Sequence, residues 1–224
     1  SAGLANLLLP GVGDVAAGRA ITQVGTGVVG VSQTLGQCFN VVGSGSGNAV
    51  PVELGSITSG RAWTIAAEIE VGPDISSLYD VISITASPAS GGGAFDRAIS
   101  FAYASGYLYA QGYIYEGGSV YATGATPIDY AVVRRITIVV TCGGGTLSVY
   151  LNGALDGSTS VASNGYTGYS DAYLSIGGIR ANSGYRVGVV ARADGVVWGA
   201  READLFHAQT YSIFEDETLW GPVA

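Results

Sequence analysis

The segment Thr146–Gly157, TLSVYLNGALDG, places Asn152 and Gly153 between two short apolar runs. Asn-Gly is the dipeptide that most readily takes the two positive-φ positions of a type I′ turn, whose twist matches that of the strands it joins. The segment therefore predicts a β-hairpin. Upstream, RRITIVVTCGGG adds a further strand and a Gly-rich turn before the strand that enters the Asn-Gly turn.

Period-two alternation predicts strands in several other segments. In AWTIAAEIEV, residues 62–71, one face is apolar and the other carries small or charged side chains, the pattern of a half-buried strand. The apolar face consists of Trp63, Ile65, Ala67, Ile69 and Val71. Further strands are expected in GTGVVGVS (25–32), NVVGSGSGNAV (40–50), LYDVISITAS (78–87), RAISFAYA (97–104), AYLSIGGI (172–179) and GYRVGVVARADGVVWG (184–199).

Only AREADLFHAQTYSIFED, residues 200–216, has a helical pattern, with an apolar side formed by Ala203, Leu205 and Phe206. Glu202 and Asp204 lie near its start, where the helix dipole favours negative charge. Many short strands with one terminal helix predict an all-β sandwich or barrel. At 224 residues we expect one domain over 1–224, with N-terminal strands and assembly contacts in 1–50 and a helix and tail in 200–224.

Charge is sparse along the whole chain. Charged residues make up 12% of the sequence and hydrophobic residues 48%; the nine basic residues are all Arg, and seventeen acidic residues give a net charge of -8. The chain therefore offers no basic stripe to a nucleic acid. Pro10 interrupts the longest apolar run of an N-terminal segment that has no basic opening, so neither a signal peptide nor a membrane span is expected.

The segment YLYAQGYIYEGGSVYATG, residues 107–124, contains a ladder of tyrosines. As one strand it directs Gln111 and four tyrosines to one face, and Leu108, Ala110, Gly112 and Ile114 to the other. The four tyrosines are Tyr107, Tyr109, Tyr113 and Tyr115. Such a face can stack sugar rings, or it can pair across strands and seal an interface between subunits. If any surface of this chain binds a glycan, we expect it to be this one.

The order of these segments resembles the laminin-G-like branch of the concanavalin A-like jelly-roll sandwiches. The resemblance covers about Asn6 to Trp220 and is carried by AWTIAAEIEV, RRITIVVTCGGGTLSVYLNGALDG, YLSIGG and GVVARADGVVWGAREADLF. It implies an antiparallel jelly-roll β-sandwich with a short C-terminal helix, in which the Asn-Gly turn joins adjacent strands of one sheet. The tail LFHAQTYSIFEDETLWGP also resembles the ends of laminin-G-like proteins encoded by bacteriophages.

The resemblance also indicates where ions and catalytic acids would lie. Calcium is the family's usual ion, and Asp156 and Asp171 are the loop acids that would hold it, but no closely spaced Asp/Asn run supports a metal site, so no cofactor is expected. Glu68 and Glu70 resemble the alternating acids of sandwich-fold glucanases, which use a third acid where this chain has Gly72. We expect both to be solvated carboxylates on a polar strand face.

The remaining residues with distinctive chemistry have structural interpretations. We expect Cys38 and Cys142 to be buried free thiols, since neither has the spacing of a zinc site. His207, the one histidine, is expected to be partly buried in the helix. Arg134 and Arg135 precede a strand and are expected on its opposite faces, protecting an edge or pairing with acids.

Together these features predict a non-enzymatic structural protein of a virion surface, decorating the head or associated with the tail and assembled in the host cytoplasm. It would pack against other virion proteins and sister subunits, with no nucleic-acid or membrane partner. A lectin-like adhesion module that binds cell-surface glycans through the tyrosine ladder is the alternative. A glycoside hydrolase using Glu68 and Glu70 is the second alternative.

Overall fold

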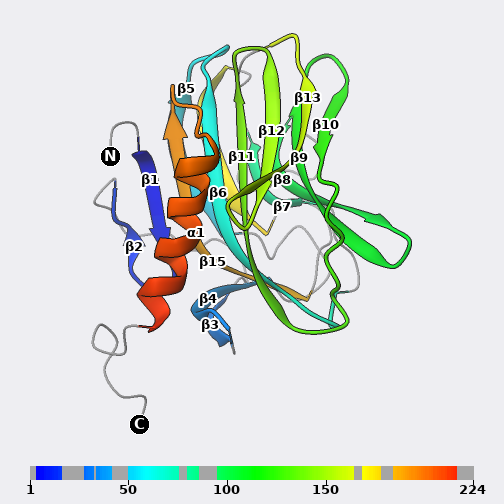
Figure 1. The fold of residues 1–224 in the computed structure, drawn as a ribbon. Coiled ribbons are helices and arrows are strands. Elements are labelled where there is room, and N and C mark those ends of the chain that lie inside the picture. Colours follow the sequence, from blue (N-terminus) through cyan, green and yellow to red (C-terminus); the bar gives the residue numbers. More distant parts are fainter. Residues whose placement is uncertain are drawn as a thin grey trace.

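The computed structural model describes residues 4–16, 28–32, 34–41, 50–75, 80–85, 95–163, 168–177 and 184–215. These residues form two antiparallel β-sheets packed face to face and one helix, α1 (Ala200–Glu215) (Figure 1). The predicted all-β sandwich with a short C-terminal helix is confirmed. The predicted strand segments within 42–49, and the tail beyond residue 215, lie outside the described residues.

The larger sheet has nine strands among the described residues. Seven of them follow one another across the sheet, and two more extend it from β15. The order is β13 (Ala154–Ser160), β12 (Thr146–Leu151), β11 (Arg134–Gly143), β6 (Trp63–Val71), β15 (Tyr185–Asp194), β1 (Leu4–Leu9) and β2 (Gly13–Asp14), while β4 (Gly36–Val41) pairs with β15 and β3 (Val28–Ser32) pairs with β4.

The smaller sheet has six strands within the same described ranges, and all its pairings are antiparallel. Their order is β10 (Ser119–Thr123), β9 (Tyr107–Tyr115), β8 (Phe95–Ala104), β7 (Asp80–Thr85), β14 (Tyr169–Ile176) and β5 (Val50–Ile57). The tyrosine ladder is therefore on the second strand from one edge of this sheet.

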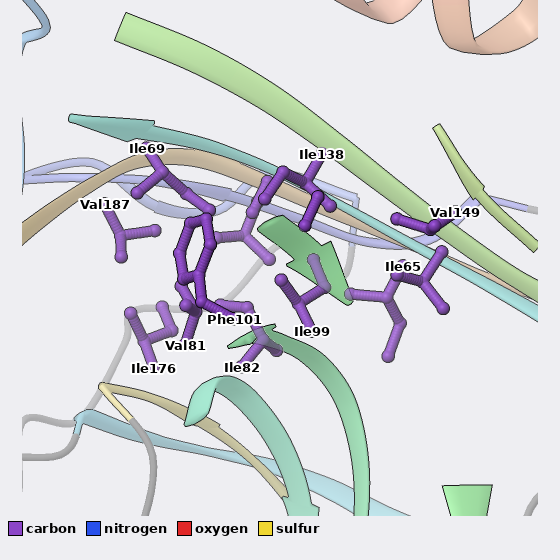
Figure 2. Close-up of a cluster of buried hydrophobic side chains, with 14 of the residues drawn as sticks. Ile65, Ile69, Val81, Ile82, Ile99, Phe101, Ile138, Val149, Ile176 and Val187 are labelled. Atoms are coloured by element: carbon purple, nitrogen blue, oxygen red, sulfur yellow. The ribbon is translucent and has the colours of Figure 1, made fainter. Parts of the chain in front are cut away.

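The core lies between the two sheets and is made mainly of β-branched aliphatic side chains (Figure 2). Their branched shape suits a pleated, buried surface, and alternation directs every second residue inward. Members from both sheets meet there, including Ile65, Ile69, Val81, Ile82, Ile99, Phe101, Ile138, Val149, Ile176 and Val187.

The Asn-Gly hairpin forms as predicted. Asn152 and Gly153 have φ values of 49° and 83°, and the flanking residues Leu151 and Ala154 pair across β12 and β13. The turn also contacts the helix, since a Cβ atom placed on Gly153 would lie 2.8 Å from the Cα atom of Asp204. Glycine is thus required here both by its backbone conformation and by the close approach of α1.

Helix α1 packs on the outer face of the larger sheet (Figure 1). Its start is closed by Glu202, whose carboxylate accepts a hydrogen bond of 3.0 Å from the Gly199 N–H. Ala203 and Phe206 are buried, but Leu205 is 48% exposed, so its predicted place on the apolar side is wrong. The buried pair packs with Ala66, Val139, Tyr150, Val189 and Ala191.

All nine residues of β6 are buried, so the predicted half-buried strand is wrong on this point. On the face that points away from the core, α1 packs on Ala66, the segment 196–198 contacts Thr64, and Thr34 contacts Glu70. Cys38 and Cys142 are buried free thiols, as predicted, and burial raises the pKa of Cys38 to about 11. Within the described ranges, no helix is long and apolar enough to cross a membrane.

Candidate functional site

Strand β9 has the two faces that the sequence predicts. Its alternate side chains Leu108, Ala110, Gly112 and Ile114 are buried on the core side, while Gln111 and the four tyrosines point outward from the smaller sheet. The outward rings differ in exposure: Tyr107 is 42% exposed and Tyr115 47% exposed, whereas Tyr109 is half-buried. Helix α1 packs on the other sheet and leaves these rings uncovered.

Tyr113 is the exception in the ladder, since only 4% of its surface is exposed. Its ring lies 4.9 Å from that of Tyr121, the residue opposite it on β10, and its hydroxyl is 3.2 Å from the Ser119 hydroxyl. Tyr113 therefore supports its neighbours and offers little surface of its own. Tyr121, which is 41% exposed, adds a ring that the sequence analysis missed. The period-two alternation in SVYAT, which places Ser119, Tyr121 and Thr123 on one face, could have predicted this ring from the sequence.

A row of polar side chains crosses the same face over three strands. The Ser100 hydroxyl on β8 donates to Gln111 Oε1 at 3.1 Å, and Gln111 Nε2 donates to the Thr123 hydroxyl on β10 at 2.9 Å. The register places these residues directly opposite one another. We call the outward side chains of Tyr107, Tyr109, Gln111, Tyr113, Tyr115, Tyr121 and Thr123 the tyrosine face.

One exposed tyrosine nearby does not belong to the tyrosine face. Tyr103 lies opposite Leu108, on the side of β8 that faces the core, but near the end of the β8–β9 hairpin, where it is 65% exposed. Its ring meets that of Tyr130 at 6.2 Å in an edge-on arrangement. Tyr103 therefore provides a control position for the tyrosine face.

The two strand acids Glu68 and Glu70 are buried, which corrects the prediction that they are solvated. Neither carboxylate faces water, and each meets an arginine from a neighbouring strand. Glu68 forms an ion pair with Arg135, and Glu70 Oε1 lies 2.8 Å from Arg186 Nη1. Since both carboxylates are covered and engaged, neither is placed to act on a glycosidic bond.

The two carboxyls differ in how readily they ionise. Burial raises the pKa of Glu68 to about 7, although Arg135 and the Val189 N–H both favour the charged form. Burial also opposes ionisation of Glu70, but hydrogen bonds from Thr34 and its other partners outweigh it and hold the pKa of Glu70 below 4.5. Space for the Glu68 carboxylate exists because residue 188 is glycine: a Cβ atom there would lie 2.5 Å from Glu68 Oε2.

His207 lies in α1 and is half-buried, as predicted. Its Nδ1 atom is 2.9 Å from the Thr137 hydroxyl, and burial lowers its pKa, with Arg135 acting in the same direction and Asp204 opposing. Arg135 also donates to the Thr210 carbonyl of the helix. These contacts attach α1 to the larger sheet, so His207 and Arg135 have a structural role.

The neighbouring arginine, Arg134, pairs with Asp129 at 3.5 Å on an exposed surface, so the two arginines occupy opposite faces of β11, as predicted.

The acids considered for calcium lie in strands, not in loops as predicted: Asp156 is in β13 and Asp171 in β14. The Asp156 carboxylate accepts hydrogen bonds from the Thr126 N–H at 3.0 Å and the Thr126 hydroxyl at 2.5 Å. Asp171 is exposed beside Ser170. Among the described residues, no group of three or more His, Cys, Asp or Glu side chains could hold a metal ion.

No model of a known protein family matches the sequence, and no curated protein matches it. Solved structures do share its fold. The binding domain of Paraclostridial Mosquitocidal Protein 1 has a TM-score of 0.64 at 12% identity, over 92% of this chain and 52% of that chain. A Trypanosoma rangeli sialidase in complex with sialic acid has a TM-score of 0.60 at 18% identity, over 93% of this chain and 33% of that chain.

A third similar structure is Domain 4 of AbnA, a GH43 extracellular arabinanase from Geobacillus stearothermophilus, in complex with arabinotriose. Its TM-score is 0.56 at 10% identity, over 92% of this chain and 98% of that chain. The chain thus spans about half the length of the mosquitocidal protein's binding domain and about a third of the sialidase. At identities this low the similarity shows the fold alone, an antiparallel β-sandwich, and these three structures do not bear on a bacteriophage origin.

Proposed function

We propose that this chain is a non-enzymatic glycan-binding module whose ligand lies on the tyrosine face. The observation that carries the proposal is the set of exposed outward rings at Tyr107, Tyr115 and Tyr121, on the sheet that α1 leaves open. An exposed aromatic ring supplies flat apolar area for the C–H face of a sugar, and its hydroxyl supplies a polar contact. The Gln111 amide and Thr123 hydroxyl beside the rings match sugar hydroxyls as donors and acceptors.

The structural neighbours support this proposal over the virion interpretation. They include an arabinanase domain solved with arabinotriose, a sialidase solved with sialic acid and the binding domain of a mosquitocidal protein. The buried, arginine-paired state of Glu68 and Glu70 supports binding without hydrolysis. The lectin-like alternative predicted from the sequence is therefore the function we favour.

A glycan array tests the proposal. Labelled wild-type protein should bind a subset of saccharides, and Tyr115→Ala should weaken that binding while Tyr103→Ala leaves it unchanged. Because Tyr115 and Tyr103 are both exposed on β-strands, the two variants should fold equally well. Wild-type protein that binds no saccharide, or binding that both variants retain in full, would refute the proposal.

The virion surface role is a second candidate, and exposed valines near the N-terminus favour it. Val31 is 78% exposed on β3, and Val12 and Val15 are 57% and 53% exposed beside β2. Apolar side chains of this kind are typical of packing surfaces when they gather in one patch. Self-association in sedimentation velocity that Val31→Asp abolishes would support it, and a monomer at every concentration would count against it.

A further inference from the structure

The aromatic rings of the tyrosine face form two groups with a polar row between them. Tyr107 and Tyr109 form the hairpin-end cluster, opposite Ala104 and Ala102 of β8. The β10 cluster lies at the other end of β9 and consists of Tyr113, Tyr115 and Tyr121. The row Ser100–Gln111–Thr123 separates the clusters.

The distance between the clusters exceeds the size of one sugar ring. Tyr109 and Tyr113 are four residues apart on one strand, which at the rise of an extended chain is about 14 Å, and Tyr107 and Tyr115 are about 27 Å apart. One sugar ring can therefore stack on either cluster but cannot touch both. A linear chain of rings laid along β9 reaches both clusters and crosses Gln111.

The polar row is suited to the middle of such a chain. Gln111 is held in place because its Oε1 accepts from Ser100 and its Nε2 donates to Thr123. A side chain fixed in this way loses little conformational entropy when a ligand binds. Its Oε1 has a second lone pair and its Nε2 a second N–H, so each atom can form one more hydrogen bond, to a sugar hydroxyl.

Resting on the proposed function, we infer that the ligand is a linear oligosaccharide that spans the polar row and stacks on both clusters, and not a single terminal sugar. Linking two weak stacking contacts in one ligand makes the second contact intramolecular, so affinity should rise steeply once the chain is long enough to reach both.

Titration calorimetry with arabino-, xylo- and cello-oligosaccharides, each from monosaccharide to hexasaccharide, tests this inference. In at least one series the hexasaccharide should bind at least about tenfold more tightly than the disaccharide. Tyr109→Ala in one cluster and Tyr115→Ala in the other should each reduce hexasaccharide affinity at least about tenfold, to the level of the short sugars. Tyr103→Ala should leave every affinity unchanged.

The outcomes separate the inference from the proposed function. A monosaccharide or disaccharide that binds as tightly as the hexasaccharide, with only one cluster sensitive to substitution, overturns the two-cluster inference and leaves glycan binding intact. The inference is also overturned if none of the three series binds in a tyrosine-dependent way while the array yields a tyrosine-dependent ligand that is not a linear oligosaccharide. No tyrosine-dependent binding in either experiment removes the proposed function itself.

Discussion

Arg135 of β11 forms an ion pair with Glu68 of β6 beneath helix α1, where the Glu68 side chain is fully shielded from water. The same guanidinium donates to the Thr210 carbonyl, so it joins the sheet to the helix. Removing a charge from water is costly even when a partner is present, which explains why the pKa of Glu68 is raised. The stability of this face should consequently depend on pH.

Glu68 should stabilise the fold at low pH. Its pKa of about 7 lies above the ordinary value of 4.5, so the folded protein binds this proton more tightly than the unfolded chain does. This contribution is complete below about pH 4.5 and is lost as the pH rises through about 7. In urea unfolding, wild type should therefore gain on the order of 1–3 kcal/mol relative to Glu68→Gln between about pH 8 and pH 5.

Glu70→Gln is the matched control for that experiment. Its pKa lies below 4.5 in the folded protein and has that ordinary value in the unfolded chain, so Glu70 is mostly ionised in both across this window. The difference between wild type and Glu70→Gln should then change by less than about 0.3 kcal/mol from about pH 8 to pH 5. A flat difference for Glu68→Gln would contradict the raised pKa.

Phe206 should account for much of the docking energy of α1. It is 7% exposed and packs on the larger sheet, with its ring 6.1 Å from that of Trp198. Phe206→Ala should lower the free energy of unfolding by about 3–5 kcal/mol in chemical denaturation. The adjacent Leu205 faces solvent, so Leu205→Ala should change it by less than about 0.5 kcal/mol. Equal losses in the two variants would show that α1 does not dock as described.

The contact between the Asn-Gly hairpin and α1 can be isolated with two glycines of similar conformation. Gly153 and Gly106 have φ values of 83° and 82°, but a new Cβ atom meets Asp204 only at Gly153. Gly106→Ala should cost about 1–2 kcal/mol for the left-handed backbone alone. Gly153→Ala should cost about 1–3 kcal/mol more, because the chain or the helix must shift. Denaturation midpoints measure both, and equal values would contradict the close approach.

Removing divalent ions should leave the fold unchanged. The described residues contain no cluster of metal-binding side chains, and Asp156 already accepts two hydrogen bonds from Thr126. The melting temperature should be the same in EDTA and in excess calcium. A rise on adding calcium, by even a few degrees, would reveal a site and reverse this expectation.

The sequence predicts strands and their faces well because alternation is a local property of the chain. The two faces of β9 and the φ values of the Asn-Gly turn follow from residue types a few positions apart. What covers a face is not local. Glu68 looks solvated in AWTIAAEIEV, yet a helix more than a hundred residues later covers it, and its partner Arg135 comes from a strand 67 positions away.

The tyrosine face is likewise predicted only in part, because alternation is local whereas the covering of a side chain is not. Alternation correctly predicts that Tyr107, Tyr109, Tyr113 and Tyr115 share one side of β9. The burial of Tyr113, however, depends on Tyr121 lying opposite it, and that depends on the register between β9 and β10. Pair register is set by the turn, here EGGS, whose geometry is less specific than that of Asn-Gly.

Glycan binding on the tyrosine face is tested most directly by side-chain chemical-shift mapping of carbon-13 tyrosine-labelled protein, titrated with the strongest ligand from the array. If the glycan lies on the tyrosine face, saturable shifts should appear at Tyr107, Tyr109, Tyr115 and Tyr121, and none at the exposed Tyr103 or at Tyr185, which is 1% exposed in the core. Shifts that avoid these four residues, or that appear equally at Tyr103, would place the ligand elsewhere and contradict the proposal.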